Sequence, residues 1–225
     1  MTESWPISTV ASMNVLAGSM IVTKLPAAFV GLLASSFLLG AALNGTQNFL
    51  VLQISALGGG ALLIGAAAAF QALAEVPTMG YTHVLAQRFS HRTLFAIGCG
   101  IYIVTFVAWA FVTSAFVAAA LKLALGVGFA LTYVAQVVLA DELAPARLRA
   151  TGQALVKAFA FGLAPIVGTF GGGLIYGTFG ARAMFLIGTV VVAAAGLIAM
   201  IAVPSPASRA AEAPAPIAEP APATP

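Results

Sequence analysis

Charged residues are scarce in this chain of 225 residues: Asp, Glu, Lys and Arg together make up 7%, whereas 61% of the residues are hydrophobic. About a quarter of the residues of a soluble domain are charged, because its surface has to stay in water. The composition therefore excludes a soluble globular domain. The formal net charge of +3 comes from a few basic residues scattered over the chain, so we expect no nucleic acid among its partners.

Cysteine is almost absent, since Cys99 is the only one, which excludes an internal disulfide and a cysteine-based metal site. The motifs HExxH and GxSxG are missing, and neither Gly98–Gly100 nor Gly126–Gly128 has the third glycine of a phosphate-binding loop. We therefore expect no enzyme activity, no metal and no cofactor.

The sequence does contain several apolar runs long enough to cross a hydrocarbon layer about 30 Å thick. Backbone polar groups in lipid have to be hydrogen-bonded within their own segment, which favours α-helices. We predict an all-α membrane protein with six transmembrane helices, over residues 27–55, 61–86, 94–113, 116–140, 150–176 and 183–203. Residues 1–26 are predicted to form a cytoplasmic or interfacial segment, with insertion of residues 7–22 as the alternative. The Pro/Ala-rich residues 204–225 are predicted to form a disordered cytoplasmic tail.

The loops between these spans differ in charge on the two sides of the membrane. One side collects Lys24, Arg88, Arg92, Arg147, Arg149 and Arg209, and the other only Arg182. The positive-inside rule makes the first side cytoplasmic. We expect a multi-pass protein of the cell (inner or plasma) membrane with its C-terminus in the cytoplasm. The charged loop residues on that side are predicted to link helix ends as gating loops: Arg88, Arg92, Asp141, Glu142, Arg147 and Arg149.

Glu75 lies near the middle of the predicted span 61–86 and therefore near the bilayer midplane. An ionisable group at this depth is costly, which makes Glu75 a candidate functional residue. Pro77 can kink the same helix and open space beside the carboxylate. The alternative is a neutral, protonated carboxyl that is hydrogen-bonded to a neighbouring helix.

Lys122 lies about two turns inside the predicted fourth span. Its ammonium either reaches the nearer membrane surface or faces the interior and pairs with Glu75. Other polar side chains within the spans are predicted to line a substrate cavity: Asn44, Gln47, Asn48, Gln71, Tyr133 and Gln136. For the face formed by Asn44, Gln47 and Asn48, hydrogen bonding between helices is the alternative.

Two further patterns concern helix packing and the position of a side chain relative to the membrane interface. Gly168 and Gly172, and then Gly173 and Gly177, have the GxxxG spacing that lets membrane helices approach closely. Trp109, near the end of the third span, is predicted to anchor the chain at the membrane interface.

Several short motifs follow one another in register, namely NGTQNFLVL at 44–52, AEVP at 74–77, RFSHR at 88–92, LGVGFA at 125–130, ELAP at 142–145, RATGQ at 149–153 and GGGLIY at 171–176. Together they resemble the C-terminal half of a major facilitator superfamily transporter. The most similar branch holds lactose permease, phenylpropionate permeases and nucleoside–proton symporters. The resemblance covers roughly residues 27–203, and it implies one half of the major facilitator fold, a 3+3 inverted repeat of six helices.

The resemblance also implies roles for two residues. Glu75 matches a carboxylate of the substrate and proton site in sugar-transporting members, and Lys122 matches a membrane-embedded lysine of lactose permease. The histidine and glutamate that follow this lysine in lactose permease correspond to Leu125 and Gly128 here, so that proton-coupling pair is missing. The loop 85–92 departs from the superfamily's gating loop as well, with Gln87 in place of an aspartate and Ser90 in place of a glycine.

We therefore predict half of a secondary active, proton-coupled transporter (a symporter) for a small-molecule substrate. The superfamily has two six-helix halves, and this chain resembles one. The expected partners are the lipid bilayer and either a separate chain that supplies the N-terminal six helices or a second copy of this chain. The alternative is a non-transporting membrane subunit or a truncated remnant of such a transporter.

Overall fold

The computed structural model describes residues 26–204, and the regular structure within that range is entirely helical. The predicted N-terminal segment up to residue 25 and the predicted tail from residue 205 lie outside the described residues. The helices are α2 (Ala27–Ala56), α3 (Ala61–Arg88), α4 (His91–Phe111), α5 (Ala115–Ala120), α6 (Lys122–Leu143), the 3-10 turn η1 (Ala146–Leu148), α7 (Arg149–Lys157), the π-helical segment η2 (Ala158–Leu163) and α8 (Ala164–Ala202).

Local chemistry explains several helix ends. Pro26 precedes α2, where its fixed φ suits the start of a helix. The chain turns after α2 at Gly58, whose φ of 85° favours glycine. The hydroxyl of Ser90 accepts a hydrogen bond from the backbone N–H of Thr93 over 3.2 Å and so caps the start of α4.

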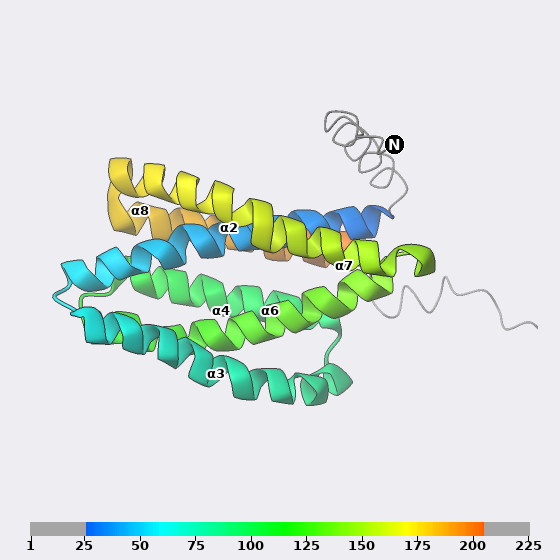
Figure 1. Cartoon of the computed structure of the whole chain (residues 1–225), viewed down its shortest axis with the longest axis horizontal. Coiled ribbons are helices and arrows are strands. Elements are labelled where there is room, and N and C mark those ends of the chain that lie inside the picture. The colour runs from blue at the N-terminus through cyan, green and yellow to red at the C-terminus, as the bar shows by residue number, and fades with distance from the viewer. Residues whose placement is uncertain (1–25, 205–225) are drawn as a thin grey trace, which may run out of the picture.

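Five continuous helical stretches are long and apolar enough to cross a membrane: Ala27–Ala56, Ala61–Arg88, His91–Phe111, Ala115–Leu143 and Ala146–Ala202. The predicted all-α membrane class is confirmed, whereas the count of six spans is not reproduced exactly. The difference lies in the last stretch, whose backbone is non-helical at Gly180, with φ 78° and ψ 176°. Figure 1 shows that α8 doubles back there, so its two parts run side by side in opposite directions. Glycine suits this position because other residues rarely adopt such a backbone conformation.

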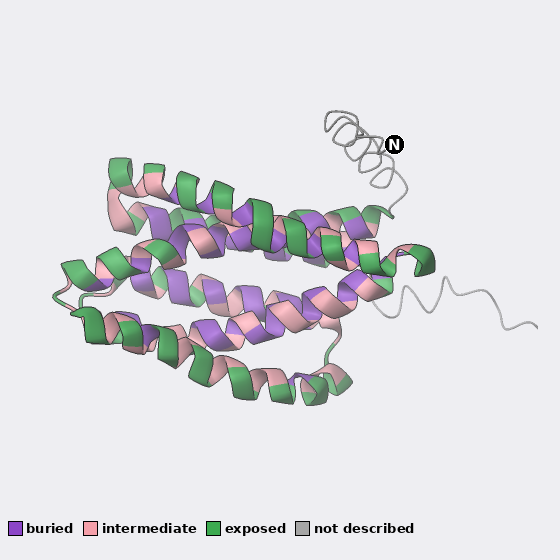
Figure 2. Ribbon diagram, viewed as in Figure 1, coloured by how far each residue is buried: buried purple, intermediate pink, exposed green. Residues whose placement is uncertain are grey.

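The helices form two groups that share one core. Helix α2 lies along α8, and α6 lies between α3 and α4, while α4 also contacts α8 (Figure 1). Figure 2 shows the buried residues on the facing sides of these helices, whereas α3 exposes most of its outer side. The exposed faces are rich in large apolar residues, as expected of a surface in contact with lipid.

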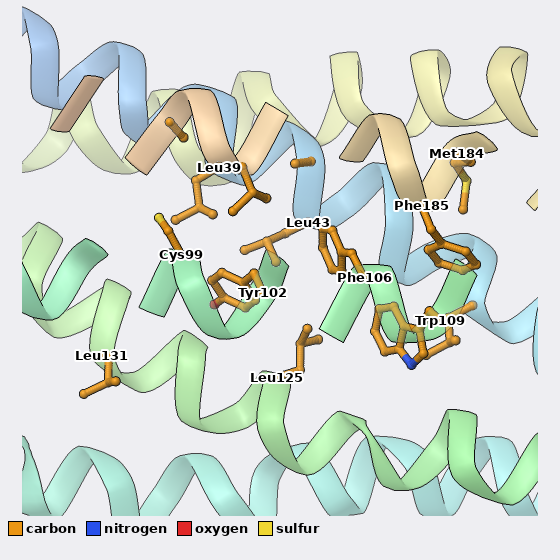
Figure 3. Packing of buried hydrophobic residues seen from close by; sticks show 14 of the residues in the cluster. Leu39, Leu43, Cys99, Tyr102, Phe106, Trp109, Leu125, Leu131, Met184 and Phe185 are labelled. Carbon is orange, nitrogen blue, oxygen red and sulfur yellow. The ribbon is translucent and has the colours of Figure 1, made fainter. Parts of the chain in front are cut away.

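An aromatic cluster connects α4 with α8 in this core (Figure 3). The Trp109 ring stacks on Phe106, and it also contacts Phe185, with ring centroids 5.6 Å apart in both pairs. Trp109 is fully buried, and its indole N–H donates to the carbonyl of Ala118 over 3.0 Å. The prediction of an interfacial anchor is therefore wrong, because bundle packing encloses this side chain.

Small residues allow α2 and α8 to touch backbone to backbone. A Cβ atom at Gly168 would collide with the backbone of Ala41, and one at Gly172 would collide with that of Gly45. The close helix contact predicted from the GxxxG spacing is thus confirmed for Gly168 and Gly172. It is wrong for the second pair, because a Cβ atom at Gly177 would have open space around it.

The two ends of the bundle differ in charge. The start of α2 meets the end of α8 where Gly31 faces Ala202. This end also carries the basic loop residues Arg88, Arg92, Arg147 and Arg149. At the opposite end the guanidinium of Arg182 lies 4.3 Å from the ring centroid of Phe111.

Candidate functional site

A cavity of about 180 Å³ lies between α2, α6 and η2. Its lining comprises Ser36, Leu39, Gly40, Leu43, Asn44, Gln47, Phe129, Thr132, Tyr133, Gln136, Ala160 and Phe161. Four of the predicted site residues are among them, namely Asn44, Gln47, Tyr133 and Gln136. The structure therefore brings together polar side chains from two helices that are far apart in the sequence.

The polar groups of this cavity differ in whether they already form hydrogen bonds within the protein. Asn44 donates through Nδ2 to the carbonyl of Gly40 over 2.9 Å, which leaves its amide oxygen available. Ser36 is fully buried, and its hydroxyl has no hydrogen-bond partner. Gln136 is only 5% exposed, and none of the side-chain hydrogen bonds among residues 26–204 involves it. Such buried polar groups are normally hydrogen-bonded. Gln136 therefore offers unused hydrogen-bonding capacity to the cavity, whereas the Ser36 hydroxyl is enclosed by protein.

Three aromatic rings form the apolar part of the lining. Phe129 and Tyr133 stack with centroids 5.6 Å apart and an interplanar angle of 14°. Phe161 meets Tyr133 edge-on, at 5.9 Å and 70°. Phe129 and Tyr133 are one helical turn apart on α6, a spacing that places them on the same face.

The π-helical segment η2 presents Ala160 and Phe161 to the cavity. π-Helical turns inside α-helices occur frequently at functional sites. Gly40 on α2 permits the close approach, because a Cβ atom there would collide with the carbonyl of Ala160. The position of Phe161 therefore depends on both the π-helical turn and this glycine.

A chain of polar side chains leads from the cavity to Glu75. The ammonium of Lys122 donates to Oε1 of Gln47 over 2.7 Å and to Oε1 of Gln71 over 2.9 Å. Gln71 lies one helical turn before Glu75 on α3, and its side chain interacts with that carboxyl group. Because a carboxylate only accepts hydrogen bonds, the amide N–H₂ of Gln71 is the group that can donate to it. We call Gln47, Lys122, Gln71 and Glu75 the amide–lysine chain.

The structure decides between the two interpretations of Lys122. Its ammonium faces α2 and α3 rather than the membrane surface, as the two hydrogen bonds show. No ion pair joins Lys122 directly to Glu75 in the described part of the chain. The two charged groups are connected through the amide of Gln71 instead.

Glu75 lies in the middle of α3 and is half-buried. The helix continues through Pro77, which has no N–H to donate to the preceding turn. The hydroxyl of the next residue, Thr78, donates to the carbonyl of Ala74 over 2.7 Å, so the Leu73 carbonyl that would pair with residue 77 stays without this partner. Glu75 thus lies on a helix with a local gap in its backbone hydrogen bonding.

Asn48 lies outside the cavity lining. Its Nδ2 donates to the hydroxyl of Thr169 over 2.9 Å and connects α2 with α8. This is the helix–helix hydrogen bond that the sequence left open as an alternative for this face.

The predicted gating residues lie at the basic end of the bundle, and several of them connect helices. Nδ1 of His91 is 3.3 Å from Oε1 of Glu142, between α4 and α6. Arg149 and Asp141 approach to 3.6 Å between α7 and α6. Nη1 of Arg92 donates to the carbonyl of Val203 over 2.9 Å, at the end of α8. Arg88 and Arg147 are exposed on the same end.

Sequence reasoning missed Ser36, Phe129, Thr132 and Phe161 as cavity residues. A signal existed for Ser36, because it falls on the same helical face as Gly40, Asn44 and Gln47, at successive turns. Phe129 could have been found from its spacing to Tyr133. Phe161 gave no signal, since the π-helical turn that sets its direction has no sequence signature. No group of side chains among residues 26–204 could hold a metal ion.

The MFS_1 like family matches residues 9–187, which is well over half of the chain. No curated protein matches it. The family match agrees with the apolar helices, the cavity between them and the ionisable groups held within the bundle. The chain belongs to the MFS_1 like family and is a multi-pass membrane protein of the major facilitator type, a family of transporters.

Proposed function

We propose that this protein is a proton-coupled secondary transporter of a small solute, a symporter in which Glu75 carries the proton. The amide–lysine chain is the observation that supports this proposal. It connects Glu75, the only carboxylate in the middle of a described span, to the lining of the cavity. An ionisable group inside a membrane bundle is costly and marks a functional site by default.

The chain supplies a means of coupling. Oε1 of Gln47 accepts from Lys122, while the Nε2 of the same amide remains for a solute in the cavity. At the other end, an ionised Glu75 accepts from Gln71, and a protonated Glu75 presents a hydroxyl donor instead. Solute and proton therefore act on opposite ends of one hydrogen-bonded chain. Binding at either end changes the free energy of binding at the other, and the effect is reciprocal.

Transport also needs an opposing wall. In transporters of this type the substrate lies near the midplane between two bundles that rock against each other. Here the cavity is bordered by Phe161, whose side chain is half exposed, so a second bundle can face it. We propose that a separate chain with six matching helices, or a second copy of this chain, supplies that bundle. The missing lactose-permease pair, replaced by Leu125 and Gly128, makes Glu75 the expected proton carrier.

The experiment uses the full chain, purified in mild detergent with whatever chain accompanies it and reconstituted into vesicles. A proton gradient is imposed, and accumulation from a defined mixture of small solutes is measured by mass spectrometry. We expect gradient-driven accumulation that Glu75→Gln abolishes and Glu75→Asp restores at least in part. Thr82→Val is the matched control, because its hydroxyl bonds only within α3.

The outcomes separate the proposal from its alternative. Gradient-driven accumulation that persists in Glu75→Gln would remove Glu75 from the mechanism. No accumulation of any solute, with or without an accompanying chain, would favour a non-transporting membrane subunit or remnant. A stoichiometric six-helix partner in the purified material would identify the second bundle.

A further inference from the structure

We propose that the cavity binds an uncharged, planar ring that carries a carboxamide-like pair of hydrogen-bond donor and acceptor. The proposal rests on the proposed function only in taking the bound molecule to be the transported solute. The binding itself follows from the charge, shape and size of the cavity lining.

The lining contains no Asp, Glu, Lys, Arg or His. An ion that enters such a site loses its hydration without gaining an opposite charge, which is strongly unfavourable. The nearest basic group belongs to Lys122, whose ammonium already donates to Gln47 and Gln71. The cavity therefore favours an uncharged molecule.

The aromatic part of the lining favours a flat ring. Phe129 and Tyr133 are nearly parallel, and Phe161 stands at a steep angle to Tyr133. Flat rings gain from offset-stacked and edge-to-face contacts of this kind, beyond the area that they bury. A saturated ring of the same size gains the free energy of apolar burial but not the additional stabilisation from aromatic stacking.

The polar part favours a group that both donates and accepts. The amide of Gln136 lines the cavity and bonds to no other described side chain. Leaving such a group unpaired is unfavourable. A carboxamide satisfies it, because its N–H₂ and its carbonyl lie side by side and match the two halves of the Gln136 amide.

The volume limits the size of the molecule. The cavity measures about 180 Å³. An apolar cavity of about 150 Å³ in another protein holds benzene. The part of the solute that this bundle encloses is therefore one six-membered ring with a small substituent.

The test is equilibrium binding, measured by saturation-transfer NMR on the full chain in lipid nanodiscs without any gradient. Four probes of similar size separate the contributions: benzamide, benzoate, cyclohexanecarboxamide and a methyl pyranoside. We expect benzamide to bind, and each of the other three to bind about ten-fold more weakly or not at all. Benzoate tests the charge, cyclohexanecarboxamide the planar ring, and the pyranoside the choice of an aromatic over a sugar ring.

Matched variants show whether benzamide occupies this cavity. Tyr133→Leu removes the central ring and should weaken binding about ten-fold, whereas Tyr133→Phe keeps the ring and should bind as the native chain does. Gln136→Leu should weaken benzamide binding about five-fold. Met184→Leu changes a separate apolar cavity of about 150 Å³ between α2 and α8 and should have no effect.

Each remaining outcome overturns the proposal. Benzoate or the pyranoside binding as tightly as benzamide would contradict the predicted solute class. Benzamide binding that survives both Tyr133→Leu and Gln136→Leu would place the molecule elsewhere. Proton-driven uptake of a different solute, without benzamide binding, would leave the proposed function intact and refute this inference alone.

Discussion

Gln71 stands between two charged residues, since its amide oxygen accepts from the ammonium of Lys122 over 2.9 Å, and Glu75 lies one helical turn further along α3 and interacts with the same side chain. An amide can do this because it has an acceptor and a donor on adjacent atoms. The lysine and the carboxylate are thereby connected without direct contact. This arrangement differs from the direct pair that the sequence suggested as one alternative, and it makes Gln71 a positioning residue.

Replacing Gln71 by leucine should therefore destabilise the protein. Gln71→Leu keeps the size of the side chain but removes the hydrogen bond to Lys122 and the polar neighbour of Glu75. A hydrogen bond to a charged group contributes about 1.5–3 kcal/mol, and partial exposure of Lys122 reduces this toward the lower limit. We expect a lower midpoint of thermal unfolding in detergent, measured by circular dichroism.

Gln53→Leu is the matched control for this prediction, because Gln53 on α2 makes no side-chain hydrogen bond to another described residue. It should change stability by less than about 0.5 kcal/mol. A double-variant cycle with Lys122→Met should be non-additive, since the two side chains share a bond. Strict additivity would show that the bond contributes nothing.

Gly126 controls the approach of α6 to α3. A Cβ atom at this position would collide with the backbone carbonyl of Gln71 and with the side chain of Ala74. Gly126→Ala should force the helices apart and lower the free energy of unfolding by about 1–3 kcal/mol. Gly100→Ala should have the opposite sign, about 0.5–1 kcal/mol stabilising, because Gly100 has open space around it and alanine favours the helix. Equal effects of the two substitutions would contradict the predicted contact.

Arg92 stabilises the last turn of α8 by donating to the carbonyl of Val203. Removing a charge-assisted hydrogen bond costs about 1.5–3 kcal/mol. Arg92→Gln should therefore accelerate amide hydrogen exchange in residues 199–203 by roughly ten-fold or more. Hydrogen exchange with mass spectrometry measures this, and Arg88→Gln serves as the control because Arg88 is exposed on the same end. Unchanged exchange in Arg92→Gln would show that the bond does not hold the helix end.

The orientation predicted from the basic loops can be tested with single cysteines. Cys99 is buried, so the native chain should react slowly with a membrane-impermeant maleimide. Ala146→Cys, at the basic end, should be labelled only from the cytoplasmic side, and Ala61→Cys, at the other end, only from outside. The reverse pattern would mean that the positive-inside rule fails for this protein.

The sequence alone was sufficient for several features. The helical membrane class follows from apolar runs and sparse charge, and both are local properties. The central place of Glu75 in its helix, and the polar character of Asn44, Gln47 and Gln136 within spans, could be read from position. The predicted spans 150–176 and 183–203 leave a break close to the turn at Gly180. The structure has one continuous helical stretch through this turn, so its count of stretches is lower by one there.

Other features depended on contacts between residues far apart in the chain. Lys122 lies 75 residues from Gln47 and 51 from Gln71, and no local pattern states which of several polar partners an ammonium reaches. Trp109 occupies a position typical of an interface anchor, but neighbouring helices enclose it. The π-helical turn that directs Phe161 into the cavity is a backbone irregularity without a residue signature.

The sequence by itself determined that the chain is a bundle of membrane helices with one carboxylate at mid-depth, because hydropathy and spacing act along the chain. Only the tertiary structure decided that a lysine and two amides connect this carboxylate to an aromatic, uncharged cavity. The physical reason is that hydrogen bonds and ring contacts form between helices, and their partners are selected by packing rather than by sequence neighbours.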